Sequence, residues 1–273
     1  MAANPLTMND QTVARRRLPN VKFRVLIVGR ANAGKTSILQ RVCDTTESPK
    51  TYEVTEGGRR EIHLDPTSER GQHNISDELE FSNHKGYVFH DSRGLESGTA
   101  DELQIIQDFV GDRSSRKRLQ DRLHAIWYCI PMDGNRESLD IKPFHNICPD
   151  KNVPVIAVFT KFETFRHNTR SNMRLNGQKG NLVAECQKRF EERYLSELGV
   201  GAKFVRLEGM QKSDARCEEL INTTMGTLDT ATVALMLLAV QTENLGLNVQ
   251  YTVSRILQKG VWRDFQYYGW VLP

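Results

Sequence analysis

A glycine-rich segment near the N-terminus has the residue types and spacing of a phosphate-binding loop. It consists of Gly29-Arg30-Ala31-Asn32-Ala33-Gly34-Lys35-Thr36 and fits the pattern G-x-x-x-x-G-K-[ST] without a mismatch. The apolar run 23–28 directly precedes it, and a helix-forming run begins at Lys35. Where a strand leads through a glycine loop into a helix, several backbone N–H groups converge on one anion. The helix N-terminus adds partial positive charge. The segment therefore predicts a nucleotide phosphate site.

The chemistry of such a loop gives roles to its side chains. Lys35 is expected to reach the β- and γ-phosphates as a catalytic residue, and the Thr36 hydroxyl is expected to ligate Mg²⁺. Other residues of the loop and its helix are expected to contact the nucleotide, namely Arg30, Ala31, Asn32, Ala33, Gly34 and Ser37.

A second motif closes another apolar run. Residues 87–94 have the sequence Y-V-F-H-D-S-R-G, a strand pattern that ends in D-x-x-G. In P-loop enzymes the acid at this point holds a water molecule bound to Mg²⁺, and the glycine amide meets the γ-phosphate. Asp91 is therefore predicted to serve the metal and Gly94 to contact the nucleotide.

The polar segment between these motifs is expected to supply a threonine that folds onto Mg²⁺ when a γ-phosphate is present. Thr67, in the sequence Asp65-Pro66-Thr67, is the preferred catalytic and metal-binding candidate. Other threonines of the segment compete for this role, namely Thr45, Thr46, Thr51 and Thr55.

A third motif, Thr160-Lys161-Phe162-Glu163, follows the apolar run 153–159. GTPases carry T-K-x-D or N-K-x-D at this place, where the carboxylate accepts hydrogen bonds from guanine N1 and N2 and the lysine stem covers the base. We therefore expect Thr160, Lys161 and Glu163 to bind the nucleotide, with a glutamate in place of the usual aspartate. The segment 207–209 follows the last apolar run, where a loop usually contacts guanine O6.

Short apolar runs alternate with longer amphipathic segments from Val21 onward, which is typical of a parallel sheet with crossover helices. The expected strands are 23–28, 87–90, 125–130, 153–159 and 203–207, and the expected helices are 35–42, 102–123 and 181–198. The polar stretch 43–80 should hold a mobile loop and one further strand ending near Phe81. The prediction is a three-layer α/β fold of the P-loop NTPase (Ras-like G domain) type, with a mostly parallel sheet.

The chain divides into three parts by composition. Residues 1–20 are polar and contain three consecutive arginines, so we expect a flexible tail, and residues 21–215 should form the G domain. Residues 216–273 should form a helical C-terminal extension, because 231–240 is apolar nearly all round and further apolar residues recur at helical spacing after it.

Composition excludes several classes of protein. The chain has 273 residues, of which 38% are hydrophobic and 26% charged, which is typical of globular proteins. Its five cysteines show no metal-binding spacing and indicate reduced thiols in the cytoplasm. The net charge of +3 is too small to predict a specific nucleic-acid partner. No apolar run approaches the roughly 20 residues of a transmembrane helix.

With these motifs in order, the chain resembles the Era/TrmE-like branch of translation-factor-type GTPases, and more narrowly a set of fungal G-domain proteins. The resemblance covers about residues 21–215 and rests on G-R-A-N-A-G-K-T, F-H-D-S-R-G, H-A-I-W-Y-C-I-P and V-I-A-V-F-T-K-F. It implies that Asn32 helps to hold a K⁺ ion against the phosphates and so belongs with the catalytic residues. Leu95 stands where Ras-type enzymes carry a glutamine, and this branch also places an apolar residue there.

Three functions remain open from the sequence. The first is a slow Mg²⁺-dependent GTPase switch that binds GTP and GDP. The second is a GTP-binding scaffold that hydrolyses negligibly and dimerises through its nucleotide face. The third is an ATP-dependent small-molecule kinase, for which residues 113–122 offer the only arginine-bearing segment that resembles a lid. The expected protein partner is a second copy of the chain, or an effector bound through the switch loops or the C-terminal extension.

Overall fold

One eight-stranded sheet organises the part of the chain that the computed structural model describes, which comprises residues 22–62, 74–92, 100–134, 136–149 and 151–240. The strand order is β3-β2-β4-β5-β1-β6-β7-β8. The strands are β1 Phe23–Val28, β2 Lys50–Thr55, β3 Gly58–Ile62, β4 Glu78–Phe81, β5 His84–Asp91, β6 Ala125–Pro131, β7 Val155–Thr160 and β8 Lys203–Arg206.

The sheet is parallel across the strands β5, β1, β6, β7 and β8. β1 pairs in parallel with β5 and β6, β6 with β7, and β7 with β8. At the other side β4 runs antiparallel to β5, and β2 runs antiparallel to both β4 and β3. All five strands expected from the apolar runs are present, and so is the strand expected to end near Phe81. The predicted fold class, a mostly parallel sheet between helical layers, is confirmed.

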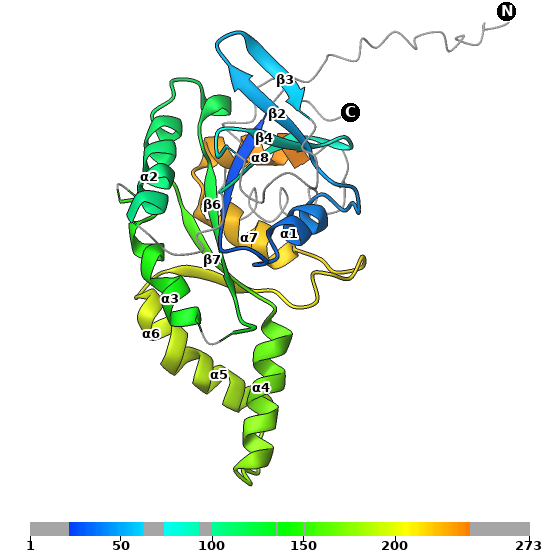
Figure 1. The fold of residues 1–273 in the computed structure, drawn as a ribbon, viewed down its shortest axis with the longest axis vertical. Coiled ribbons are helices and arrows are strands. Elements are labelled where there is room, and N and C mark those ends of the chain that lie inside the picture. Colours follow the sequence, from blue (N-terminus) through cyan, green and yellow to red (C-terminus); the bar gives the residue numbers. More distant parts are fainter. Residues whose placement is uncertain (1–21, 63–73, 93–99, 135, 150, 241–273) are drawn as a thin grey trace, which may run out of the picture.

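Helices cover both faces of the sheet (Figure 1). They are α1 Lys35–Val42, α2 Ala100–Ser114, α3 Glu137–Ile141, α4 Phe162–Leu175, α5 Leu182–Phe190, α6 Ser196–Leu198, α7 Glu218–Thr227 and α8 Thr230–Val240. The short 3₁₀ turns η1 Leu119–Asp121 and η2 Lys142–Asn146 follow α2 and α3, and the π-helical turn η3 Glu191–Leu195 joins α5 to α6.

Alternate residues of β1 point into two separate cores, as the period of a strand requires. Phe23, Val25 and Ile27 belong to a core with side chains of α1, α7 and α8, whereas Leu26 and Val28 belong to a core with side chains of α2 to α6. Every residue of β1 is buried, which explains why the strand has a continuous apolar sequence.

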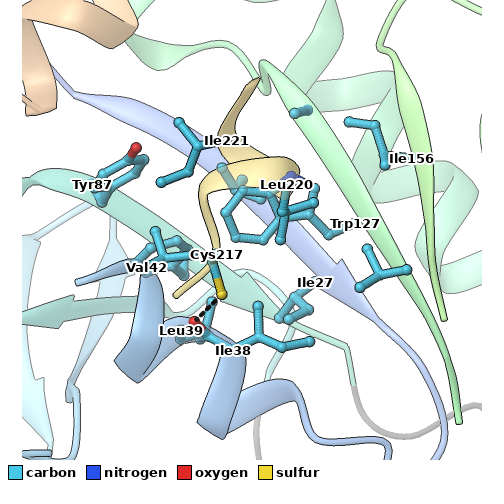
Figure 2. Close-up of a cluster of buried hydrophobic side chains, with 14 of the residues drawn as sticks. Ile27, Ile38, Leu39, Val42, Tyr87, Trp127, Ile156, Cys217, Leu220 and Ile221 are labelled. Carbon is cyan, nitrogen blue, oxygen red and sulfur yellow. Dashed lines mark hydrogen bonds between the residues drawn. The ribbon is translucent and has the colours of Figure 1, made fainter. Parts of the chain in front are cut away.

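The first of these cores joins the phosphate-loop helix to the C-terminal helices. Figure 2 shows Ile38 of α1 and Leu220 of α7 gathered with Ile27, Trp127 and other buried side chains of the sheet. The indole N–H of Trp127 donates a hydrogen bond of 3.0 Å to the Thr224 hydroxyl of α7. The described helices of the predicted C-terminal extension therefore share the core of the sheet, and the division at residue 216 stays a prediction.

The hairpin of β2 and β3 lies within the segment expected to contain a mobile loop. Its sequence is polar, so the apolar pattern that reveals the other strands is missing. Cross-strand pairs stabilise it instead: Glu53 bonds Arg60 at 2.9 Å, and the Arg59 guanidinium lies 3.6 Å from the ring centroid of Tyr52. This hairpin was not predicted from the sequence, and the mobile loop expected within 43–80 stays a prediction because residues 63–73 lie outside the described residues.

Two helices differ from expectation. The helix expected over 102–123 ends at Ser114, where the hydroxyls of Ser114 and Ser115 bond to the carbonyls of Gly111 and Asp112 and so compete with the helical hydrogen bonds. Helix α4 was not expected, although Phe162, Phe165, Thr169 and Met173 form its buried stripe. Among the described helices, none is long and apolar enough to cross a membrane.

Candidate functional site

The parallel strands bring the sequence motifs to one edge of the sheet. Asp91 lies beside Ile27 in the register of β5 and β1, just before the phosphate loop begins at Gly29. Thr160 lies beside Pro131 in the register of β7 and β6. Three motifs that are far apart in the sequence therefore meet at the carboxyl ends of the strands, where α/β sheets bind their ligands.

The phosphate loop turns between β1 and α1 in a space that admits only glycine at its first position. A Cβ added to Gly29 would lie 2.8 Å from the carbonyl oxygen of Cys129 on β6, which is closer than real side chains come. The Ala33 amide then donates to the Arg30 carbonyl at 3.2 Å and closes a turn, and Gly34 caps α1 with a φ of 84°. The strand, loop and helix arrangement predicted from the motif is present.

Lys35 bends back over the loop from the first turn of α1. Its ammonium group donates to the carbonyls of Gly29 at 2.9 Å and Arg30 at 3.3 Å, and it lies 3.7 Å from a carboxylate oxygen of Asp91. The amine is thus held above the loop where a phosphate chain would lie. The carboxylate expected to serve Mg²⁺ faces the same space.

The third motif is attached directly to the phosphate loop. The buried hydroxyl of Thr160 donates to the carbonyl of Ala33 at 2.8 Å. This contact ties Thr160 to the phosphate loop, and its expected contact with the nucleotide stays a prediction. It also fixes the distance between the phosphate loop and the residues that follow Thr160.

An acidic residue that the sequence motifs do not include connects the same two loops. Asp133, just beyond β6, accepts from Arg30 at 3.1 Å with one oxygen and from Lys161 with the other. Burial alone would raise the pKa of Asp133, but the hydrogen bond and charge of Lys161 outweigh it and lower that pKa. Arg30 also bonds Asp140 at 3.2 Å, so its guanidinium is turned toward β6 and α3. An acid directly after an apolar run was the signal available for Asp133.

Glu163 reaches across to the loop that follows β8. Its Oε2 accepts a hydrogen bond of 3.1 Å from the amide of Gly209. The backbone joins the same segments, because the Phe162 amide donates to the Leu207 carbonyl at 3.1 Å. The two stretches expected to contact a guanine base are therefore neighbours in the structure.

The remaining predicted residues are placed as follows. Ala31, Asn32 and Thr36 are exposed on the loop and the start of α1, and Ser37 is half-buried. Thr67 and Gly94 lie outside the described residues, as does Leu95. Of the four competing threonines, Thr51 and Thr55 belong to β2, and Thr45 and Thr46 follow α1.

Among the described residues, no group of three or more His, Cys, Asp or Glu side chains forms a metal site. The Mg²⁺ site predicted from the sequence is of another kind, in which a hydroxyl and a carboxylate are completed by phosphate oxygens and water. Thr36 and Asp91 are oxygen donors of that type beside the loop. The residues present fit the ion.

The arginine-bearing segment 113–122 lies at the amino ends of the parallel strands, opposite to the carboxyl ends that carry the motifs. The Leu123 amide bonds the carbonyl of Arg113, and the His124 amide bonds the carbonyl of Arg24 at the beginning of β1. The phosphate loop follows the other end of that strand, about 17 Å away at the usual rise of a strand. The segment is not placed as a lid over the phosphates.

A cleft of about 820 Å³ lies elsewhere, between α4 and the segment from α5 to α6. Its walls include Asn168, Asn172 and Arg193, and none of the predicted site residues lines it. Met132 and Gly134, on either side of Asp133, also line it, so one end of the cleft borders the site.

Comparisons with known proteins give structural neighbours only. No protein-family model matches the sequence, and no curated protein matches it. Aquifex aeolicus Era bound to GDP·AlF4⁻ matches at 15% identity and a TM-score of 0.39, covering 77% of this chain and 57% of that chain. The G domain of the T. maritima FeoB iron transporter matches at 13% identity and a TM-score of 0.39, and the match covers 75% of this chain and 98% of that chain. A GTP-binding protein from Sulfolobus solfataricus in complex with GDP matches at 13% identity and a TM-score of 0.37, and the match covers 80% of this chain and 53% of that chain.

The chain spans little more than half the length of the Era and Sulfolobus chains that it matches. The TM-scores lie below 0.5, so the fold assignment rests on this chain's own strand order and loop contacts.

Proposed function

We propose that the chain binds guanine nucleotides with Mg²⁺ and acts as a slow GTPase switch. The observation that carries the proposal is the phosphate loop with Lys35 folded over its carbonyls and Asp91 facing the same amine. An ammonium group and converging backbone amides suit a polyphosphate, and they are supported by the dipole of α1. Glu163 on the first turn of α4 and the amide of Gly209 after β8 are neighbours, and an acceptor beside a donor supports guanine as the base.

In this function the residues of the chain orient the nucleotide and balance its charge. Lys35 binds the β- and γ-phosphates, and Thr36, Asp91 and Thr67 would hold Mg²⁺, which neutralises charge on the phosphate oxygens. Gly94 contacts the γ-phosphate, and Asn32 would help to hold a K⁺ ion that offsets charge developing on the bridging oxygen. In such a switch, Thr67 and Gly94 would contact the γ-phosphate side of GTP and lose those contacts on hydrolysis.

The test is the affinity of the purified full chain for GDP, GTP, ADP and ATP, measured by titration with fluorescent nucleotides. We expect guanine nucleotides to bind more tightly than adenine nucleotides, and Lys35→Ala to weaken binding at least tenfold, since a charge-assisted contact contributes about 1.5–3 kcal/mol. The matched control is Lys117→Ala, an exposed lysine far from the loop. Unchanged affinity in Lys35→Ala would refute the phosphate site.

Hydrolysis is measured separately, by single-turnover assays in KCl and in NaCl at matched ionic strength. A switch should hydrolyse slowly and faster in KCl, with the increment lost in Asn32→Ser. No turnover in either salt, together with tight GTP binding, would favour the scaffold that dimerises through its nucleotide face. The kinase alternative loses its lid candidate because residues 113–122 lie at the amino ends of the parallel strands.

A further inference from the structure

The hydrogen bond between Glu163 and Gly209 joins two groups that the proposed function requires for the base. Glu163 lies on the first turn of α4, after β7, and Gly209 lies after β8. The carboxylate oxygen and the amide nitrogen are 3.1 Å apart, so the bond uses the single donor of the Gly209 amide and one acceptor site of the carboxylate. Both groups lie at the sheet edge that carries the phosphate loop, because Thr160 is bonded to that loop at 2.8 Å.

An acceptor and a donor side by side complement the edge of guanine. Guanine presents O6 as an acceptor, and N1–H and the N2 amino group as donors. Adenine presents an amino group in place of O6 and an unprotonated N1, so it matches neither partner. The pair Glu163 and Gly209 is therefore complementary to guanine, but in the structure the two groups are bonded to each other.

The length of the side chain matters to this contact. A glutamate carries its carboxylate one methylene farther from the backbone than the aspartate usual at this position of the motif. The added length lets Glu163 cross from α4 to the next loop and reach the amide of Gly209. A shorter aspartate would keep the carboxylate over the start of α4.

The loop that carries Gly209 is held by other contacts as well. The Phe162 amide bonds the Leu207 carbonyl at 3.1 Å, and the Leu207 amide bonds the Phe159 carbonyl at 2.8 Å. Arg166 of α4 bonds Glu208 at 2.8 Å. Loss of the bond from Glu163 should therefore leave the loop in its place, with the Gly209 amide turned toward the base.

We infer that the bond between Glu163 and Gly209 competes with guanine for the base site and sets both the affinity and the specificity of that site. This inference rests on the proposed function. Guanine O6 can accept from the Gly209 amide only when the internal bond is open, because that amide has a single donor, so the measured affinity is reduced by the fraction of molecules in which the bond is closed. Glu163 is then a specificity-determining residue that also weakens the binding it directs.

The test is a set of substitutions assayed with GDP and ADP by calorimetry, so that hydrolysis does not interfere. Glu163→Asp should bind GDP about three- to tenfold more tightly, which is the fold-change expected when one internal hydrogen bond no longer has to be broken. Its affinity for ADP should change by less than twofold. Glu163→Gln keeps the length but turns an amino group toward guanine N1–H, so its GDP affinity should fall at least tenfold.

The matched control is Glu185→Asp, the same shortening at a side chain of α5 that bonds Arg189 and lies outside the site. Its GDP affinity should equal that of the unmodified chain. Equal or weaker GDP binding by Glu163→Asp would overturn the inference, and so would an equal gain for GDP and ADP. If the unmodified chain binds neither GDP nor GTP, the proposed function is refuted. If it binds GDP but Glu163→Asp does not change that affinity, only the inference is refuted.

Discussion

At the scale of single residues, the site depends on side chains that bind one another before any ligand is considered. Lys35 donates to loop carbonyls, Thr160 donates to the carbonyl of Ala33, and Lys161 donates to the carboxylate of Asp133. Such contacts limit the motion of flexible side chains and so reduce the entropy lost when a ligand binds. Asp133 is the shared partner of Lys161 and Arg30, and it joins the segment between β7 and α4 to the phosphate loop.

The role of Asp133 can be measured by replacing it with asparagine. Asp133→Asn removes the charge that holds Lys161, and the pair is about one-third exposed, so the loss should be modest. We expect the affinity for GDP to fall about two- to fivefold by fluorescence titration.

The matched control for this change is Asp112→Asn, which breaks the exposed pair with Arg116 on α2. It should leave GDP affinity unchanged. If Asp133→Asn binds GDP as well as the unmodified chain does, the bridge does not position the nucleotide site.

At the scale of elements, helix α8 shows how an apolar segment is assigned to a core. Asp229 caps it by accepting hydrogen bonds of 2.9 Å from the amide and the hydroxyl of Thr232. Val233 and Met236 are buried in the core shared with α1 and α7, whereas Ala234 is exposed. The helix therefore has a buried side, although its sequence is apolar nearly all round.

Met236→Ala tests this packing because the side chain of Met236 is fully buried. We expect the free energy of unfolding in urea to fall by about 2–4 kcal/mol, from lost apolar burial and the remaining cavity. Ala234→Ser on the exposed side of the same helix should change it by less than about 0.5 kcal/mol. A small effect at Met236 would mean that α8 is not part of the core.

At the scale of the whole molecule, two buried histidines link stability to pH. His124 accepts from the Arg24 amide through Nδ1 at 2.8 Å, and its Nε2 faces the Leu119 carbonyl. His90 has its Nδ1 against the carbonyls of Ile75 and Asp77 and its Nε2 toward Arg24. Burial lowers the pKa of His90 to about 3 and that of His124 to about 4. Both rings are therefore neutral in the folded protein at pH 5.

The unfolded chain binds protons on these histidines below pH 6.5, while the folded chain does not, so stability should fall as the pH is lowered from 7 to 5. The loss at pH 5 is about 2 kcal/mol for each histidine, from 1.36 kcal/mol per pH unit. His124→Asn retains an acceptor for the Arg24 amide and should halve this pH dependence in urea unfolding. The exposed His167→Asn should leave it unchanged, and an unaltered slope in His124→Asn would contradict the assignment.

The sequence by itself determined the parts of this protein that depend on neighbours along the chain. Continuous apolar runs predicted β1, β6 and β7, because strands buried on both faces need apolar residues throughout. The phosphate loop was predictable because its glycines, lysine and flanking elements lie within one short segment. The general place of Asp91 and Glu163 followed, since parallel strands end at a common edge.

Only the tertiary structure decided the contacts between segments far apart in the sequence. The bond of Glu163 to Gly209 and the bridge of Asp133 depend on the register of neighbouring strands and on side-chain reach, which no local pattern encodes. The hairpin of β2 and β3 depends on cross-strand pairs and not on an apolar period, so its polar sequence resembled a loop. Position in space, and not residue type alone, separates the arginines of 113–122 from the phosphate loop.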